Sequence, residues 1–234
     1  MKSAETSSDL IGNQIINFPS LKVARPLLKM VLHFAAHVTV KKELLKMGVE
    51  FINRDGVPLY KHQADVGDEF ENHFKENGGK GTFTIVIPPN GGKTLASVYC
   101  MHLARKHFGI DTFIVAAPSL LIRNDWQKEA TIFDVKLSKE VSNRSIVQRK
   151  FSDDQLDGFA VTYQSIAKFP ELYRKLAHDQ NTCVVFDEIH HLGENLSWGE
   201  GCLEAFEYAD IKICLSGTPF RTDGQTIPFL EYEQ

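Results

Sequence analysis

The chain has 234 residues, of which 43% are hydrophobic and 24% are charged, a balance typical of a folded globular protein rather than a disordered one. Its formal net charge of −4 argues against a general polyanion binder, so any contact with nucleic acid must come from a local patch. The four cysteines form no C-x-x-C pair and no secretory signal is visible, which predicts a soluble protein of the reducing cytoplasm with no membrane contact.

Residues 1–50 are predicted to form a helical N-terminal extension. From Leu21 to Met47 apolar residues recur at helical spacing, between helix start and stop signals. His33 and His37 lie one helical turn apart and could share a metal ion, but no third ligand is apparent. Packing or hydrogen bonding is therefore the favoured interpretation of this histidine pair.

Residues 51–234 are predicted to form one α/β domain. Short apolar runs typical of buried strands alternate with helical patterns. The predicted strands are 83–87, 112–117, 158–162, 182–186 and 211–215, and the predicted helices are 64–74, 95–108, 119–133, 165–177 and 200–208. This alternation predicts a parallel sheet with helices on both faces. Polar residues follow each strand, at the edge where such sheets bind ligands.

Two polar segments of this domain have open interpretations. Gln63 opens the helix before the first strand, and its amide could contact an adenine edge, although local sequence favours an exposed helix-start glutamine. The segment from Lys136 to Asp157 is rich in charge. It could face a polyanion, but a solvated connector is the favoured interpretation.

The first strand leads into Asn90-Gly91-Gly92-Lys93-Thr94, and a helical pattern follows at once. Strand, glycine-rich turn and helix together are typical of a phosphate-binding loop, in which backbone N–H groups and a helix N-terminus face the anion. Lys93 would reach the β- and γ-phosphates, and the Thr94 hydroxyl would ligate Mg²⁺. Ile87 stands where the full G-x-x-x-x-G-K-[ST] pattern has its first glycine, so a surface loop with a chance GGKT is the alternative.

Asp187 and Glu188 directly follow a buried strand of the same predicted sheet. Asp187 is predicted to serve the Mg²⁺ shell, and Glu188 to orient and deprotonate the attacking water, because phosphoryl transfer needs positioning and charge stabilisation. The alternatives are two acids at a helix N-terminus, or a zinc site built from Glu188, His190 and His191. No further ligand stands at zinc spacing.

With these segments in place, the chain resembles the first RecA-like lobe of DExH-type superfamily-two helicases and translocases. The resemblance covers about Val57 to Phe229. LYKHQ is similar to the Q-type element, IPPNGGKT to motif I, AAPSLLIRNDW to motif Ia, VTYQS to motif Ib, FDEIHH to motif II and LSGTPFR to motif III. The branch it resembles contains restriction-enzyme motors and repair helicases.

The resemblance implies an ATP- and Mg²⁺-dependent hydrolase that works on nucleic acid, with a leaning to double-stranded DNA. Gln63 would read the adenine, and His190 would contact the γ-phosphate side or the other lobe. The residues implied to face the nucleic-acid backbone are Pro118, Ser119, Thr162, Tyr163 and Gln164. Ser216 and Thr218 would couple the nucleotide state to that surface.

The printed sequence ends at Gln234, soon after motif III, without a Q-x-x-G-R-x-x-R stretch like motif VI. A second RecA-like lobe, in the same or a separate chain, is therefore expected to supply the arginine finger, and the isolated lobe is expected to hydrolyse ATP weakly. Arg221 is expected to make a salt bridge or a lobe-facing contact. A truncated, non-catalytic nucleotide-sensing or interaction module is the alternative. An unrelated P-loop ATPase is disfavoured by SGTPFR and TYQS.

Overall fold

The computed structural model describes residues 50–138, 142–148, 156–194, 196–217 and 227–230. The chain divides into two units, Met1–Glu50 and Phe51–Gln234. The predicted N-terminal helix, with His33 and His37, lies outside the described residues. Thr218 and Arg221 lie outside them too. The N-terminal helical domain therefore stays a prediction.

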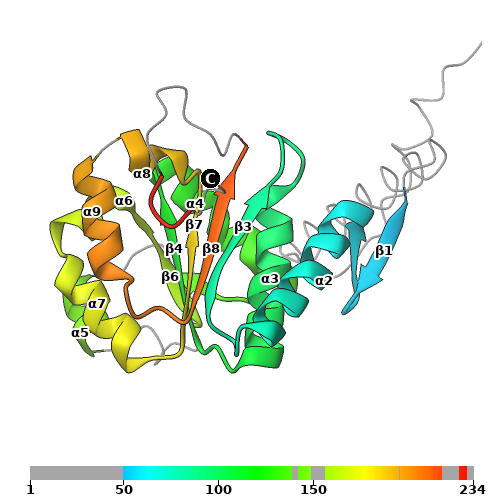
Figure 1. Cartoon of the computed structure of the whole chain (residues 1–234), viewed down its shortest axis with the longest axis horizontal. Coiled ribbons are helices and arrows are strands. Elements are labelled where there is room, and N and C mark those ends of the chain that lie inside the picture. Colours follow the sequence, from blue (N-terminus) through cyan, green and yellow to red (C-terminus); the bar gives the residue numbers. More distant parts are fainter. Residues whose placement is uncertain (1–49, 139–141, 149–155, 195, 218–226, 231–234) are drawn as a thin grey trace, which may run out of the picture. The chain divides into compact units, whose positions relative to one another are not determined.

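The second unit is built on a six-stranded sheet in the order β3-β8-β7-β4-β6-β5, in which every neighbouring pair is parallel (Figure 1). The strands are β3 (Gly81–Val86), β4 (Thr112–Ala117), β5 (Leu137–Ser138), β6 (Gly158–Thr162), β7 (Thr182–Phe186) and β8 (Ile211–Ser216). The predicted parallel α/β fold is confirmed. Parallel strands bring their carboxyl ends to one edge, so the polar residues that follow them share that edge.

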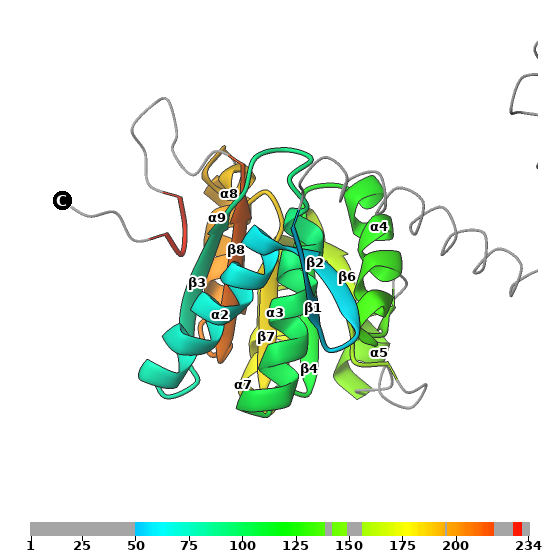
Figure 2. The same ribbon diagram turned by 90° about the vertical axis from the view of Figure 1, so that its right-hand side faces the viewer.

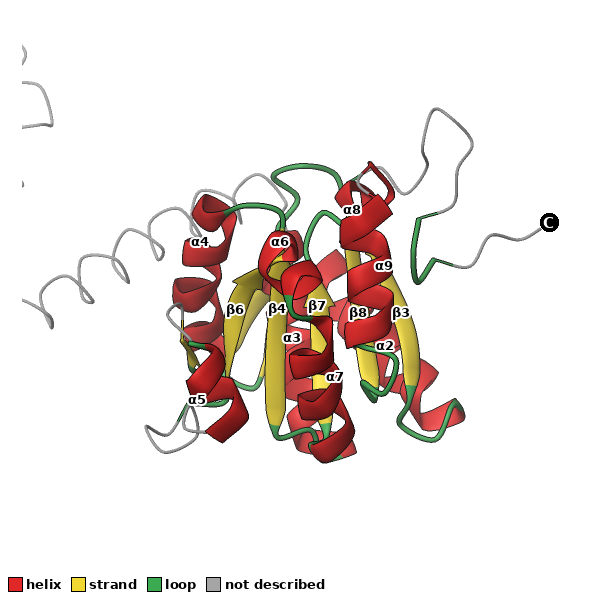
Figure 3. Ribbon diagram, turned by 90° about the vertical axis from the view of Figure 1, so that its left-hand side faces the viewer, coloured by secondary structure: helices red, strands yellow, loops and turns green. Residues whose placement is uncertain are grey.

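Helices cover both faces of the sheet. They are α2 (Lys61–Glu76), α3 (Lys93–Phe108), α4 (Leu120–Ala130), η1 (Thr131–Phe133), α5 (Asn143–Gln148), α6 (Tyr163–Lys168), α7 (Pro170–Asp179), α8 (His190–Glu194) and α9 (Leu196–Ala205). Figure 2 shows α2, α3 and α4 over one face, and Figure 3 shows α5, α6, α7 and α9 over the other. Alternate strand residues enter opposite cores: Val115 and Val185 pack under α3, whereas Ile114 and Val184 pack under α7 and α9. Among the described residues no helix is long and apolar enough to cross a membrane.

An antiparallel hairpin of β1 (Phe51–Arg54) and β2 (Val57–Tyr60) precedes α2, and the sequence reasoning missed it. Its turn residues, Asp55 and Gly56, both have positive φ, as an Asp-Gly type I′ turn requires. The Asp55 carboxylate accepts hydrogen bonds from Lys106 Nζ at 2.9 Å and from His102 Nε2 at 3.0 Å, which tie the hairpin to α3. The Asp-Gly pair was the signal that could have revealed it.

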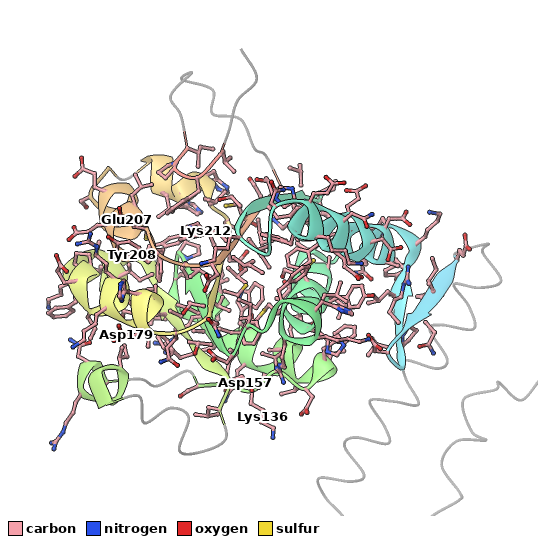
Figure 4. The ribbon with its side chains drawn as sticks, turned by 60° about the horizontal axis from the view of Figure 1, so that its bottom comes forward. Lys136, Asp157, Asp179, Glu207, Tyr208 and Lys212 are labelled. Atoms are coloured by element: carbon pink, nitrogen blue, oxygen red, sulfur yellow. The ribbon has the colours of Figure 1, made fainter. Side chains whose placement is uncertain are left out.

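The segment from Lys136 to Asp157 contains more structure than the predicted solvated connector. Leu137 is buried in β5, which pairs with β6, and Ile146 of α5 is also buried. The Asp157 carboxylate accepts from the Lys136 N–H at 2.7 Å and from Arg105 at 3.3 Å, and Figure 4 shows Lys136 and Asp157 side by side. The prediction of a solvated connector is wrong for these described residues. The burial of Leu137 and Ile146 stabilises local structure in a segment whose composition is otherwise polar.

Candidate active site

The glycine-rich loop runs from the end of β3 to the start of α3. Asn90 and Gly92 have φ values of 62° and 82°, both in the left-handed region, and the Gly91 N–H donates to the Pro88 carbonyl at 3.0 Å. Ile87, which replaces the first glycine of the motif, is buried. A Cβ on Gly91 would lie 2.4 Å from Ile87 Cγ2, so the glycine at 91 makes room for the isoleucine at 87.

Two side chains at the start of α2 hold this loop. Gln63 is 1% exposed, and both ends of its amide bond to backbone: Nε2 donates to the Gly92 carbonyl at 3.1 Å, and Oε1 accepts from the Tyr60 N–H at 3.0 Å. His62 Nε2 lies 2.9 Å from the Gly91 carbonyl, which can only accept, so this nitrogen carries the proton. Gln63 is therefore buried rather than an exposed helix-start residue, and its adenine contact stays a prediction. Sequence reasoning missed His62.

An ion pair joins the loop to the acidic end of β7. Lys93 Nζ lies 2.5 Å from Glu188 Oε1, and the two side chains are 10% and 28% exposed. Glu188 has a φ of 51°, a left-handed conformation that costs a non-glycine residue about 1–2 kcal/mol. The fold thus aims a carboxylate at the loop lysine over a separation of 95 residues.

His190 connects this pair to β8. Its Nδ1 lies 3.5 Å from Glu188 Oε2 and 3.5 Å from the hydroxyl of Ser216, which is fully buried. The structure therefore brings Lys93, Glu188, His190 and Ser216 together, from three strand ends that are separate in sequence. The coupling role of Ser216 stays a prediction.

Asp187 lies at the carboxyl end of β7 and is 7% exposed. Its N–H donates to the Ala116 carbonyl at 2.8 Å, and its Oδ2 accepts from the Trp126 indole at 2.7 Å. Burial raises the pKa of this carboxyl, while the bond from Trp126 and the charge of Lys93 act against that rise. Sequence reasoning missed Trp126, because no local pattern shows that an indole on α4 contacts the end of β7.

The donor chemistry fits Mg²⁺. Desolvation disfavours the charged form of a buried carboxylate, and a nearby cation stabilises that charge. Carboxylate and hydroxyl oxygens are also the hard ligands that Mg²⁺ prefers. Asp187 offers the carboxylate, and Thr94, the second residue of α3, offers the hydroxyl. Among the described residues no three His, Cys, Asp or Glu side chains gather as metal ligands, so the zinc alternative at His190 and His191 gains no support.

Asp187→Asn is expected to stabilise the fold at pH 7 and to weaken the Mg²⁺ dependence of nucleotide affinity by about tenfold. The pKa of Asp187 is higher in the folded state than in the unfolded state, so the free energy of unfolding falls as the pH rises through this range. At pH 7 the ionised Asp187 carboxylate therefore destabilises the fold. Urea unfolding at pH 7 measures the gain, with exposed Asp125→Asn as the control. A less stable Asp187→Asn protein would contradict the burial argument.

The candidates for the nucleic-acid side lie at the neighbouring carboxyl ends of β4 and β6, where Ala117 pairs with Thr162. Ser119 caps α4 by accepting from the Ile122 N–H at 3.4 Å and is exposed, and Gln164 is also exposed. The Pro118 ring is partly exposed beside Ser119, and Thr162 is buried as the cap of α6. Tyr163 is fully buried, and its hydroxyl donates to the Asp187 carbonyl at 2.7 Å. In this structure Tyr163 therefore supports the Asp187 peptide rather than an outer surface.

Residues 56–221 match the family described as type III restriction enzyme, res subunit. The chain belongs to this family. Two similar proteins are the uncharacterized proteins ML1624 of Mycobacterium leprae and Rv2917 of Mycobacterium tuberculosis. Each is 31% identical over 64% of this chain. The chain spans about a quarter of their length, 24% in both cases.

Solved structures share the fold of this chain. A nuclease-deletion mutant of the Type ISP restriction-modification enzyme LlaGI, in complex with a DNA substrate mimic, aligns with a TM-score of 0.54 at 16% identity, over 72% of this chain and 18% of that one. The Sulfolobus solfataricus SWI2/SNF2 ATPase core, in complex with dsDNA, aligns with a TM-score of 0.52 at 19% identity, over 68% and 32%. The family match and the shared fold confirm the predicted resemblance to the first RecA-like lobe of superfamily-two helicases.

Proposed function

We propose that residues 51–234 are the ATP-binding lobe of a nucleic-acid-dependent helicase or translocase that acts on double-stranded DNA. Paired with a second RecA-like lobe, it couples ATP hydrolysis to movement or remodelling. The observation that carries this proposal is the contact between Lys93 and Glu188, because it aims an acidic strand end at the lysine of a glycine-rich loop. The complexes of LlaGI with a DNA substrate mimic and of the SWI2/SNF2 core with dsDNA support the choice of DNA.

The geometry supports a separate task for each side chain. Phosphate oxygens would replace Glu188 as the partner of Lys93, since a loop lysine is a point charge that binds phosphate. Glu188, released from the lysine, would orient a water and accept its proton. Thr94 and Asp187 would hold Mg²⁺, which neutralises phosphate charge when bound. His190 lies between Glu188 and Ser216, so it would transmit to β8 whether Glu188 is paired with Lys93 or released from it.

The nucleic-acid side would grip the phosphate backbone rather than read bases. Ser119 and Gln164 are exposed on adjacent strand ends and offer hydroxyl and amide groups, while the chain as a whole is acidic. Contacts of this kind position a duplex without carrying sequence information, and phosphate binding weakens steeply with salt.

The 234-residue chain alone is expected to bind Mg-ATP and to turn it over very slowly, because it holds the phosphate and metal side of the site without a motif VI arginine. Steady-state phosphate release with and without duplex DNA measures this, with Lys93→Ala as the control for a contaminating ATPase. Brisk, DNA-stimulated turnover by this chain alone would contradict the need for a second lobe. Binding without turnover even after a second lobe is added would favour the non-catalytic nucleotide-sensing module.

A further inference from the structure

Two aromatic side chains from different helices donate hydrogen bonds to Asp187. Trp126 Nε1, from α4, reaches the carboxylate oxygen Oδ2 at 2.7 Å. The Tyr163 hydroxyl, from α6, reaches the backbone carbonyl at 2.7 Å. Both donors are almost completely buried, with exposed fractions of 1% and 0%. Asp187 is thus held from both faces of the sheet, since α4 and α6 pack on opposite sides of it.

The two bonds act on different parts of Asp187. The Tyr163 bond fixes the peptide group between Asp187 and Glu188, and the bond from the Asp187 N–H to Ala116 fixes the preceding peptide group. The Trp126 bond fixes the carboxylate itself. An indole has one donor and no acceptor, and it cannot exchange this partner for water at 1% exposure. An ionised acceptor also makes this hydrogen bond stronger than one between neutral groups.

We propose that Trp126 is a positioning residue for the metal site: its indole N–H holds Oδ2 of Asp187 so that the carboxylate keeps the orientation in which it serves the Mg²⁺ shell. The inference rests on the proposed function, since it takes Asp187 as a metal-shell residue. Hydrogen bonds to a ligating carboxylate fix its geometry, and their loss typically costs 10–100-fold in metal affinity. The site therefore includes Trp126 of α4, which lies about two helical turns after the Ser119 cap of that helix.

The first test removes the donor and keeps a buried ring. Trp126→Phe is compared with Trp198→Phe, which makes the same change in α9 at a ring that packs beside Tyr163, 6.3 Å between ring centroids, and which keeps the indole bond to the Asp187 carboxylate. A fluorescent ATP analogue is bound to the full chain, and Mg²⁺ is titrated from a chelated, metal-free start. Trp126→Phe is expected to need about tenfold more Mg²⁺ for its half-maximal effect. Its metal-free nucleotide affinity should match the parent within about twofold, because the loop and Lys93 are unchanged.

The outcomes separate the two proposals. If the parent binds the nucleotide with a clear Mg²⁺ dependence and Trp126→Phe shows the same midpoint, the positioning role is wrong and the proposed function stands. If the parent shows no Mg²⁺ dependence, the metal role of Asp187 fails, and the positioning role fails with it. A Trp198→Phe protein with the weakened Mg²⁺ response of Trp126→Phe would also overturn the assignment, because the effect would then not require loss of the Trp126 bond to the Asp187 carboxylate.

The second test leaves Trp126 in place, so it does not depend on the folding of Trp126→Phe. The chain has two tryptophans, and Trp198→Phe leaves Trp126 as the only indole. Mg²⁺ added to the complex of this variant with ATP is expected to shift or quench the emission, with the midpoint found in the binding titration. A ring that only filled the core would give constant emission. Constant emission across a Mg²⁺ range that changes nucleotide affinity would overturn the inference.

Discussion

Lys93→Ala is expected to bind nucleotide roughly 10- to 100-fold more weakly than the parent, because a hydrogen bond to a charged group contributes about 1.5–3 kcal/mol. The lysine points into the site, where it pairs with Glu188. The change therefore removes the group that would meet the β- and γ-phosphates. Titration of a fluorescent ATP analogue measures the loss.

The control for this change is Lys175→Ala, since Lys175 is exposed on α7 and lies outside the site. It removes the same charge from the chain and should leave nucleotide affinity unchanged. Equal affinity for Lys93→Ala and the parent would mean that the loop from Asn90 to Gly92 does not cradle a phosphate.

Glu188→Gln is expected to lower hydrolysis by about 10²–10⁴-fold once a second lobe is supplied in trans or by fusion. The amide keeps the shape of the side chain but cannot accept a proton from water. Binding of Mg-ATP should stay equal to the parent or become tighter, because the structure shows Glu188 occupying Lys93 through a 2.5 Å contact that phosphate would have to replace. Single-turnover hydrolysis and an ATP titration measure the two effects separately.

Glu204→Gln is the matched control, because Glu204 is exposed on α9, away from Lys93. It should hydrolyse ATP at the parental rate in the reconstituted protein. A Glu188→Gln protein that hydrolyses as fast as this control would show that Glu188 is not the base. A large loss of ATP binding would instead indicate that Glu188 supports the loop rather than the chemistry.

Local patterns predicted the elements whose burial is uniform. The run from Thr112 to Ala117 forms a strand with those bounds, and all of its residues are buried. The hairpin at Asp55 and Gly56 was overlooked, although its turn chemistry is local and readable. β5 could not be predicted, because two residues give no period and their pairing with β6 depends on the whole fold.

The site shows the same division between local and distant information. The sequence placed Lys93 on a loop before a helix and Glu188 after a strand; in the structure Lys93 is the first residue of α3, and Glu188 follows β7 as predicted. It could not show that their side chains meet, since this contact depends on the order of strands in the sheet. The burial of Gln63 and Tyr163 also depends on tertiary packing, which brings each against a backbone carbonyl that is distant in sequence.

The loop from Asn90 to Thr94 is expected to bind Mg-ATP. Calorimetric titration of ATP into the parent chain, with Mg²⁺ and again with a chelator, tests it most directly. We expect saturable binding of one ATP per chain, tighter with Mg²⁺ than without, and lost in large part in Lys93→Ala. Absence of saturable binding at millimolar ATP, or binding that Lys93→Ala leaves unchanged, would contradict the account.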